Sequence, residues 1–304
     1  MRKILQQFIE VKHTRLFMLF IYHLARVFYG RKYAARLFLK RYLYLKDKIE
    51  FVDTSGDEIS DYVFVMWLQK NPPELVEACI ERQREFYPNL TVITNDNISD
   101  FIEIPAYIKE KLEKGIISYA NFSDYVRSCL LAKYGGVWLD STCYLTSKIP
   151  EDIRKADLFL FKYINCVFKE HSTSLVEGIL LNQAISSYLI VAKKNNYLMR
   201  LMQKFMEEYW KENNFICHYF FWHYYVMLLK KYDKNVSQML DLSPIALSQN
   251  TQMMQHFLYK DYSEDIIEQL KRLSFLHKLS YKTFGKESIS ENCLYKKLIR
   301  RELR

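Results

Sequence analysis

The sequence predicts an α/β fold with helical additions at both ends. An apolar run from Tyr62 to Leu68 precedes a helix-like segment and a second apolar run at 90–94, which is the order of a βαβ unit. A third apolar run, at 137–139, follows Gly135 and Gly136. Half of the 304 residues are hydrophobic and only 7 are Gly and 6 Pro, so the chain is expected to fold and to be rich in helix.

Helix-start and turn residues predict the boundaries of the first βαβ unit. Pro72 and Pro73 stand where a helix begins, and apolar residues then recur at helical spacing as far as Phe86. Pro88 and Asn89 predict a turn before the next strand. Neither G-x-G-x-x-G nor a Walker phosphate loop follows the first strand, which argues against a dinucleotide enzyme or an ATPase.

The stretch from Ser123 to Thr142 combines local structure with candidate chemistry. Ser123 is predicted to cap a helix that the two glycines end, and Asp140 follows the buried strand at 137–139. A carboxylate at this position faces the edge of an α/β sheet where ligands bind. Asp124 and Arg127, three residues apart, are predicted to project from one helix face. The structural alternative is that Asp124 caps its helix and pairs with Arg127, while Asp140 begins a turn.

This stretch also carries a family resemblance. The order S-D-Y-x-R and then Y-G-G-x-W-L-D-S-T resembles the capsular polysaccharide synthesis proteins, relatives of the glycosyltransferase family 32 sugar transferases. The segment SFLHKLSYK, from Ser274 to Lys282, is similar to a second family segment. The resemblance implies a GT-A-like, Rossmann-type domain that binds a nucleotide sugar, over residues 51–285. The usual family motif ends in Asp-x-Asp, whereas this chain has Thr142 in place of the second Asp.

The resemblance also implies roles for single residues. Asp140 would hold Mn²⁺ or Mg²⁺ on the donor diphosphate, with Thr142 and His277 as further ligands. Alternatively, water completes the metal shell and His277 bonds a phosphate oxygen. The other donor-binding candidates are Arg127 for a phosphate or sugar oxygen, Asp124 for sugar hydroxyls, Trp67 for the base, Tyr119, and the two lysines Lys278 and Lys282 for phosphate charge. For Trp67 a core position, and for the lysine segment a basic surface strand, are the structural alternatives.

The positive charge of the chain lies at its amino terminus. The formal net charge is +9, and residues 1–48 hold 12 Lys and Arg against only Glu10 and Asp47. Aromatic and apolar residues are interspersed, but no run of about 20 uncharged residues exists to span a membrane. Residues 1–50 are therefore predicted to be a basic amphipathic helical segment on an anionic membrane surface. A solvated helical hairpin packed on the main domain is the alternative, and nucleic acid is not favoured because no binding motif accompanies the charge.

Two further features complete the prediction. Residues 286–304 are predicted to form a basic carboxyl-terminal helix of unknown role. The 6 cysteines lack the paired spacing of a zinc site and are expected to be core thiols in a reducing compartment.

The predicted function is a metal-dependent retaining glycosyltransferase. It would move a hexose from a nucleotide diphosphate sugar, a UDP-sugar, to a capsular or other surface polysaccharide acceptor that is lipid-linked. The protein would be cytoplasmic and peripheral on the inner face of the cell membrane. Two rivals remain: a non-catalytic membrane-docking protein of a polysaccharide assembly complex, which Thr142 favours, and a sugar-phosphate transferase that uses the same donor.

Overall fold

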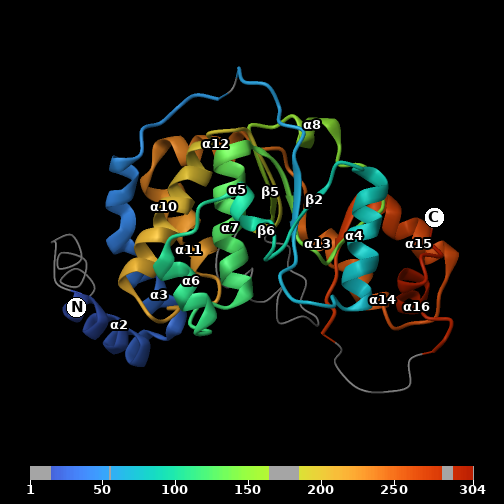
Figure 1. Ribbon diagram of the computed structural model, residues 1–304, viewed down its shortest axis with the longest axis horizontal. Coiled ribbons are helices and arrows are strands. Elements are labelled where there is room, and N and C mark those ends of the chain that lie inside the picture. Colours follow the sequence, from blue (N-terminus) through green and yellow to red (C-terminus); the bar gives the residue numbers. More distant parts are fainter. Residues whose placement is uncertain (1–14, 55, 164–184, 283–289, 304) are drawn as a thin grey trace. The chain divides into compact units, whose positions relative to one another are not determined.

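The computed structural model describes residues 15–54, 56–163, 185–282 and 290–303 (Figure 1). The described chain is a mixed α/β protein that divides into two compact units. Unit 1 comprises residues 1–56, 102–133 and 195–242, and unit 2 comprises residues 57–101, 134–194 and 243–304. The predicted domain at 51–285 spans both units, because residues 102–133 and 195–242 group with the amino-terminal residues in unit 1.

Unit 2 contains the predicted sheet. Its strands are β1 (Val63–Met66), β2 (Thr91–Ile93), β3 (Gly136–Leu139), β5 (Leu158–Lys162) and β6 (Ile185–Ala192), in the order β2-β1-β3-β6-β5. β1 is parallel to β2 and β3, whereas β6 is antiparallel to both of its neighbours. Every residue of β1, β3 and β6 is buried; β1 and β3 are unbroken apolar runs, whereas β6 also buries Ser186 and Ser187. The predicted strands 62–68, 90–94 and 137–139 are confirmed.

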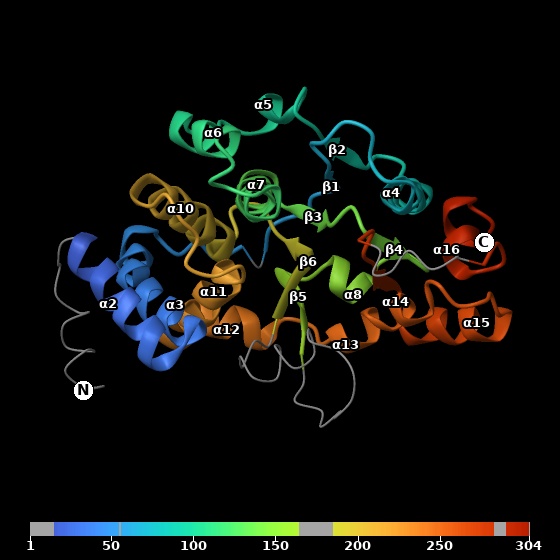
Figure 2. The ribbon, with the colours of Figure 1, turned by 90° about the horizontal axis from the view of Figure 1, so that it is seen from below.

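A second, two-stranded sheet lies in the same unit. β4 (Cys143–Leu145) pairs antiparallel with β7 (Leu276–Lys278), so the late basic segment returns to the residues that follow β3. α4 (Glu74–Phe86) packs against β4, and its buried face includes Val76 and Ile80, as the helical spacing predicts. The remaining helices of unit 2 are short: α5 (Ile98–Phe101), α8 (Glu151–Arg154), α13 (Ser248–Thr251), α14 (Met253–Phe257), α15 (Glu264–Leu273) and α16 (Leu294–Ile299). α13 and α14 contact β7, and α13, α14 and α15 follow one another in Figure 2.

Unit 1 is helical among its described residues. Its elements are α2 (Arg15–Tyr29), α3 (Arg31–Leu39), the 3₁₀ helix η1 (Lys40–Lys48), α6 (Ala106–Glu113), α7 (Tyr119–Tyr134, which ends one residue into unit 2), α10 (Tyr197–Glu212), α11 (Phe221–Tyr232) and α12 (Lys234–Leu242). Aromatic rings fill its core. Phe205 on α10 stacks on Tyr225 of α11, with ring centroids 3.8 Å apart. Within the run at 217–232, Phe221, Trp222, Tyr224 and Tyr225 are fully buried, whereas Tyr219 and Tyr232 are exposed.

The later part of the basic amino-terminal segment, α3 and η1, belongs to this core. Phe38 and Tyr42 are at most 1% exposed, and the Tyr42 hydroxyl accepts a hydrogen bond from Asn213 Nδ2 and donates one to Glu212. The Tyr225 hydroxyl donates to the Tyr42 carbonyl oxygen. α3 and η1 are thus integral parts of unit 1.

Two predicted details at the ends of helices also change. α7 begins at Tyr119, so Ser123 lies inside the helix, and Ser118 Oγ instead accepts the backbone N–H of Asn121. At the carboxyl terminus the described helix is α16, which is shorter than the predicted 286–304; residues 286–289 lie outside the described part of the chain. Five of the cysteines are buried free thiols, and Cys166 lies outside the described residues.

The two glycines before β3 are required by close packing. Gly135 and Gly136 have φ of 68° and 94°, in the region that favours glycine. A Cβ on Gly136 would lie 2.2 Å from the carbonyl oxygen of Tyr62, and one on Gly135 would lie 2.4 Å from the backbone nitrogen of Lys194. Because no side chain fits, the Gly-Gly pair sets β3 directly beside β1.

Candidate functional site

The carboxyl ends of β1 and β3 meet at one edge of the sheet in unit 2. Val65 pairs with Leu139 across the two parallel strands, so Trp67 and Asp140 both lie just beyond the paired residues. Ligands of open α/β sheets bind at this edge. The prediction that Asp140 follows the strand is confirmed, and Trp67 follows β1 as the base platform requires.

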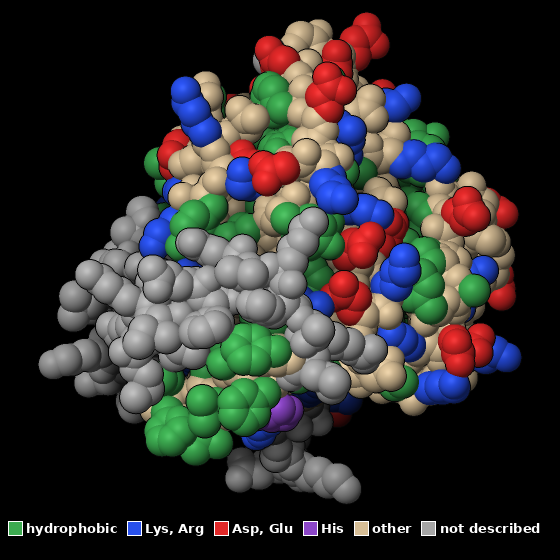
Figure 3. Space-filling model, turned by 90° about the vertical axis from the view of Figure 1, so that its left-hand side faces the viewer, with side chains coloured by type: hydrophobic (Ala, Val, Ile, Leu, Met, Phe, Trp, Pro, Cys, Tyr) green, Lys and Arg blue, Asp and Glu red, His purple; other side chains and the backbone are tan. Residues whose placement is uncertain are grey.

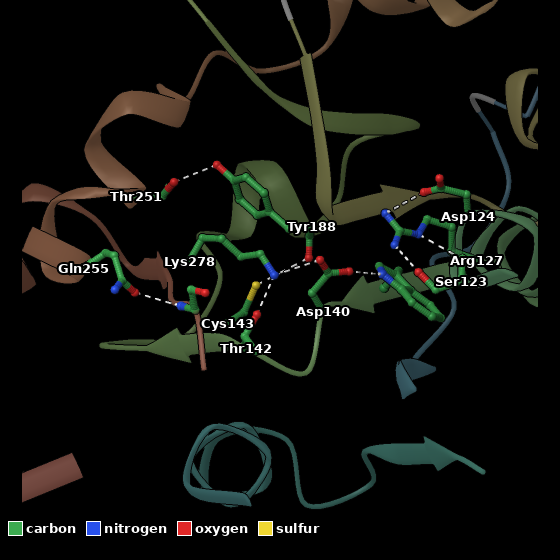
Figure 4. A network of polar contacts seen from close by, with 12 residues as sticks. Ser123, Asp124, Arg127, Asp140, Thr142, Cys143, Tyr188, Thr251, Gln255 and Lys278 are labelled. Atoms are coloured by element: carbon green, nitrogen blue, oxygen red, sulfur yellow. Dashed lines mark hydrogen bonds and ion pairs between the residues drawn. The ribbon is translucent and has the colours of Figure 1, made fainter. Parts of the chain in front are cut away.

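Asp140 is held by contacts through both of its carboxylate oxygens. The indole Nε1 of Trp138 donates to Oδ1 over 2.9 Å, and the Lys278 ammonium donates to Oδ2 over 3.0 Å (Figure 4). The backbone is held as well, because Gln83 Nε2 donates to the carbonyl oxygens of Asp140 and Cys143. The carboxylate is therefore a fixed, partly exposed acceptor, with 22% of its side chain accessible.

Lys278 joins Asp140 to Thr142. Its Nζ donates to Thr142 Oγ1 over 2.5 Å as well as to Asp140. The pairing of β4 with β7 produces this contact, since Cys143 faces Lys278 in the register and Thr142 accepts the backbone N–H of Leu279. The two segments that carry the family resemblance thus meet in one hydrogen-bonded cluster, which we call the Asp140 cluster: Trp138, Asp140, Thr142 and Lys278.

His277 faces the other side of β7. Successive side chains of a strand point to opposite faces, so His277 is turned away from the face that carries Lys278. Its imidazole is fully buried and Nε2 contacts the carbonyl oxygen of Leu270 on α15. Burial lowers the pKa of His277, which keeps the ring neutral. The expected ligation of a cation beside Asp140, and the alternative bond to a donor phosphate there, do not fit this position.

Trp67 has an aromatic neighbour that the sequence does not predict. The Tyr281 ring packs edge-on against Trp67, with centroids 5.6 Å apart and planes at 81°. Trp67 is only partly buried, and its Nε1 has no hydrogen-bond partner. Tyr281 is 37% exposed and lies three residues after Lys278, and Lys282, the other lysine candidate, is exposed beside it. Trp67 therefore packs beside the segment after β7, which carries Tyr281 and Lys282.

The helix candidates lie in unit 1 and form a cluster of their own. Asp124 and Arg127 on α7 are 8% and 4% exposed and form an ion pair of 3.4 Å between Oδ1 and Nη1. Arg127 also donates to the carbonyl and the hydroxyl oxygens of Ser123 (Figure 4). Tyr119, at the start of α7, is 47% exposed. The predicted common helix face of Asp124 and Arg127 is confirmed, as is the pairing that the structural alternative expects.

Comparison with known proteins decides the family. Residues 18–298 match the model of a family described as capsular polysaccharide synthesis protein. The chain belongs to this family. Among solved structures, the PaToxG glycosyltransferase is similar over 81% of this chain and 99% of that chain, at 12% identity and a TM-score of 0.37. No curated protein matches the sequence.

The residues of this capsular polysaccharide synthesis family member do not fit the metal centre that the resemblance implies. No group of three or more His, Cys, Asp or Glu side chains in the described ranges is arranged to hold a metal ion. Asp140 supplies the single carboxylate of the cluster, and the position beside it that a cation requires is taken by the Lys278 ammonium. The side chains present form a lysine–carboxylate ion pair rather than a set of metal ligands, so we assign no reaction step to a metal ion.

The structure adds three residues that pattern analysis of the chain did not single out. Trp138 and Gln83 hold Asp140, and Tyr281 contacts Trp67. Trp138 lies within an apolar run and was therefore interpreted only as part of a strand. Residues two apart on a strand point to the same face, and this spacing is the sequence signal that Trp138 and Asp140 lie side by side. Gln83 and Tyr281 act through tertiary contacts, for which sequence spacing gives no signal.

Proposed function

We propose that this family member is a GT-A-like glycosyltransferase that moves a hexose from a UDP-sugar to a capsular or other surface polysaccharide acceptor. The observation that carries the proposal is the joint position of Trp67 and the Asp140 cluster at the carboxyl ends of β1 and β3. An aromatic ring suits a nucleobase, and an ammonium suits a diphosphate. Family membership supports the acceptor class, since the family is described by capsular polysaccharide synthesis.

The chemistry of the proposed reaction follows from the leaving group. The bond between the anomeric carbon and the phosphate oxygen breaks, and its electron pair stays on the departing UDP. The acceptor hydroxyl oxygen bonds the anomeric carbon and its proton passes to the departing diphosphate. Basic groups fixed beside that diphosphate stabilise the charge that develops, which is the largest contribution of many active sites. The family resemblance extends the proposal to retention of configuration.

The test is donor hydrolysis with the full-length protein. A panel of UDP-hexoses and other nucleotide sugars is incubated with the protein, once with EDTA and once with Mn²⁺, and nucleotide release is measured. The proposal expects UDP. Release of UMP would instead support a sugar-phosphate transferase, and no release from any donor in either condition would support a non-catalytic docking protein. Either of these two results overturns the proposal.

We further propose that the protein binds the inner face of the cell membrane through α2, where a lipid-linked acceptor is accessible. α2 has two apolar faces. Met18, Ile21, Tyr22 and Ala25 are buried, whereas the opposite face exposes Phe20 (61%), Leu24 (39%), Val27 (78%) and Phe28 (69%). The exposed residues recur at helical spacing, so they form one stripe, which we call the α2 stripe. Figure 3 shows hydrophobic side chains gathered on this side of the molecule.

Charge selects a lipid surface as the occupant of the α2 stripe. Arg26 and Arg31 are exposed within and just after α2, and residues 1–48 carry 12 basic against 2 acidic residues. A mixture of exposed aromatic and basic residues is typical of helices that lie on anionic bilayers. Within the described residues, no helix has the length and hydropathy needed to cross a membrane. The proposed association is therefore peripheral.

Vesicle binding tests this location. Wild type should co-sediment with vesicles containing phosphatidylserine, less so with neutral phosphatidylcholine, and less at high salt because screening weakens the attraction. The double variant Val27→Asp/Phe28→Asp should lose most of the binding. Leu242→Asp is the matched control, because Leu242 is 77% exposed on α12 and outside the stripe. Equal binding by wild type and the double variant would reject the α2 stripe as the docking surface.

A further inference from the structure

The Asp140 cluster places a protein cation where a metal ion would otherwise stand. Asp140 Oδ2 and Thr142 Oγ1 both accept hydrogen bonds from Lys278 Nζ, at 3.0 and 2.5 Å. Asp140 and Thr142 are the first and third residues of the D-S-T motif that follows β3. The other carboxylate oxygen, Oδ1, is engaged by Trp138. Both oxygens of the carboxylate and the hydroxyl of Thr142 thus meet donors within unit 2.

A divalent ion would have to displace this ammonium. An ion bound to Asp140 Oδ2 would lie within a few ångströms of Lys278, and like charges at that distance repel strongly in a partly buried site. The replacement of a second carboxylate by Thr142 also disfavours a divalent ion, because it removes a negative charge from the site. A hydroxyl accepts the ammonium hydrogen bond without adding negative charge, so Asp140 and Lys278 balance one to one.

The lysine is positioned to meet an anion as well as its partners. Lys278 is 25% exposed on its side chain, and it bonds Asp140, which follows β3 as Trp67 follows the neighbouring strand β1. Its strand is fixed on both sides: Thr142 accepts the backbone N–H of Leu279, and Gln255 Oε1 accepts that of Ser280. Such a preorganised ammonium stabilises charge on a bound diphosphate without having to be ordered at the moment of reaction.

We propose that Lys278, held by Asp140 and Thr142, takes the place of a divalent cation, so that the protein binds the diphosphate of its donor without metal. This inference rests on the proposed function and specifies how that site recognises its substrate. Asp140 is then a positioning residue for the lysine rather than a metal ligand. Charge on the departing diphosphate is stabilised by the ammonium through hydrogen bonds and charge attraction.

The experiment measures binding of UDP itself by calorimetry, with full-length protein in EDTA and then in Mn²⁺. The dissociation constant should agree within about twofold between the two conditions. Lys278→Met keeps the length and apolar stem of the side chain but removes the charge, and should weaken binding in EDTA by about tenfold or more. Lys155→Met is the control, because Lys155 is an exposed lysine of unit 2 that pairs with Glu151 at the end of α8. Melting temperatures confirm that each variant is folded.

The outcomes separate the two proposals. UDP binding by wild type that disappears in EDTA and returns with Mn²⁺ overturns the metal-free site and leaves the transferase proposal standing. Absence of UDP binding in both conditions overturns the proposed donor and the metal-free site together. If Lys278→Met binds UDP as wild type does in EDTA, the lysine does not contact the diphosphate and the inference is wrong. Mn²⁺ that strengthens binding to Lys278→Met but not to wild type supports it, because removal of the ammonium opens Asp140 to a metal.

Discussion

Trp138 and Asp140 lie two residues apart, and the indole Nε1 of the first donates a hydrogen bond to the carboxylate of the second over 2.9 Å. This bond orients the carboxylate that holds Lys278. Trp138→Phe removes the donor but keeps an aromatic ring in the core. We expect UDP to bind about fivefold to tenfold more weakly, which corresponds to about 1 kcal/mol, the net contribution of a typical hydrogen bond. Calorimetry on the folded variant checks this, and unchanged UDP affinity would show that the bond has no part in binding.

Trp67 is expected to stack on the base of the donor. Trp67→Leu should weaken UDP binding by roughly 1–3 kcal/mol, the range measured for stacking of a base on an aromatic side chain, whereas Trp67→Phe should keep most of it. Titration with ribose 5-phosphate, which lacks a base, provides the comparison. If Trp67→Leu and wild type bind UDP equally, Trp67 has only its packing role against Tyr281.

Gly136→Ala is predicted to be strongly destabilising. The new Cβ would lie 2.2 Å from the Tyr62 carbonyl oxygen, at a backbone φ of 94° that L-residues rarely adopt. Both effects act on the pairing of β1 with β3, so we expect a loss of about 3 kcal/mol or more in unfolding free energy. Urea denaturation measures it. Gly115→Ala is the control, since Gly115 also has positive φ but no atom within 4 Å of its Cβ position, and it should cost less.

Variants of the buried ion pair between Asp124 and Arg127 distinguish a role in stability from a role in donor binding. Arg127→Met leaves the Asp124 carboxylate without this partner and should cost about 3 kcal/mol or more. The double variant Asp124→Asn/Arg127→Met removes both charges and should recover much of that stability. If the pair also contacts the donor, as the resemblance implies, the stable double variant will remain inactive in donor hydrolysis. Wild-type activity in that variant would limit both residues to a structural role.

His218 predicts a pH dependence of stability. Burial, with Lys32, Arg31 and Arg36 nearby, lowers the pKa of His218 to about 4, below its usual 6.5. The unfolded chain therefore takes up a proton as pH falls below about 6.5, and the folded chain does so only near 4. The contribution to stability is complete above pH 6.5 and is lost between about 6.5 and 4. His218→Asn keeps an acceptor for the backbone N–H of Phe220, and its stability should decline less over that range in urea titrations.

The parts of the fold that local sequence determines were predictable. The strand at 137–139 is an apolar run bounded by Gly-Gly and Asp140, and no other element type suits three buried residues between such neighbours. Placing Asp140 at the sheet edge follows from that strand alone. The start of α7 was predicted wrongly, because both Ser118 and Ser123 can cap a helix and only the fold selects between them.

The partners of Asp140 were not predictable in the same way. Lys278 lies 138 residues away, and its contact depends on the pairing of β4 with β7. In that pairing, neighbouring residues of β7 point to opposite faces, so Lys278 faces Asp140 and His277 faces the opposite side. The family resemblance placed both His277 and Lys278 at the donor site, because it applies to the whole segment that contains them. The strand register, which spacing in one sequence does not reveal, separates them.

The burial of Phe38 and Tyr42 bears on the proposed membrane contact of α2. α3 and η1 complete the core of unit 1, and Met18, Ile21, Tyr22 and Ala25 of α2 are buried as well. The proposed contact surface is therefore part of a helix that is packed into unit 1, and proteolytic removal of the basic segment would remove part of that core. On this proposal, release from a bilayer would come from a change in lipid charge or ionic strength, both of which are reversible.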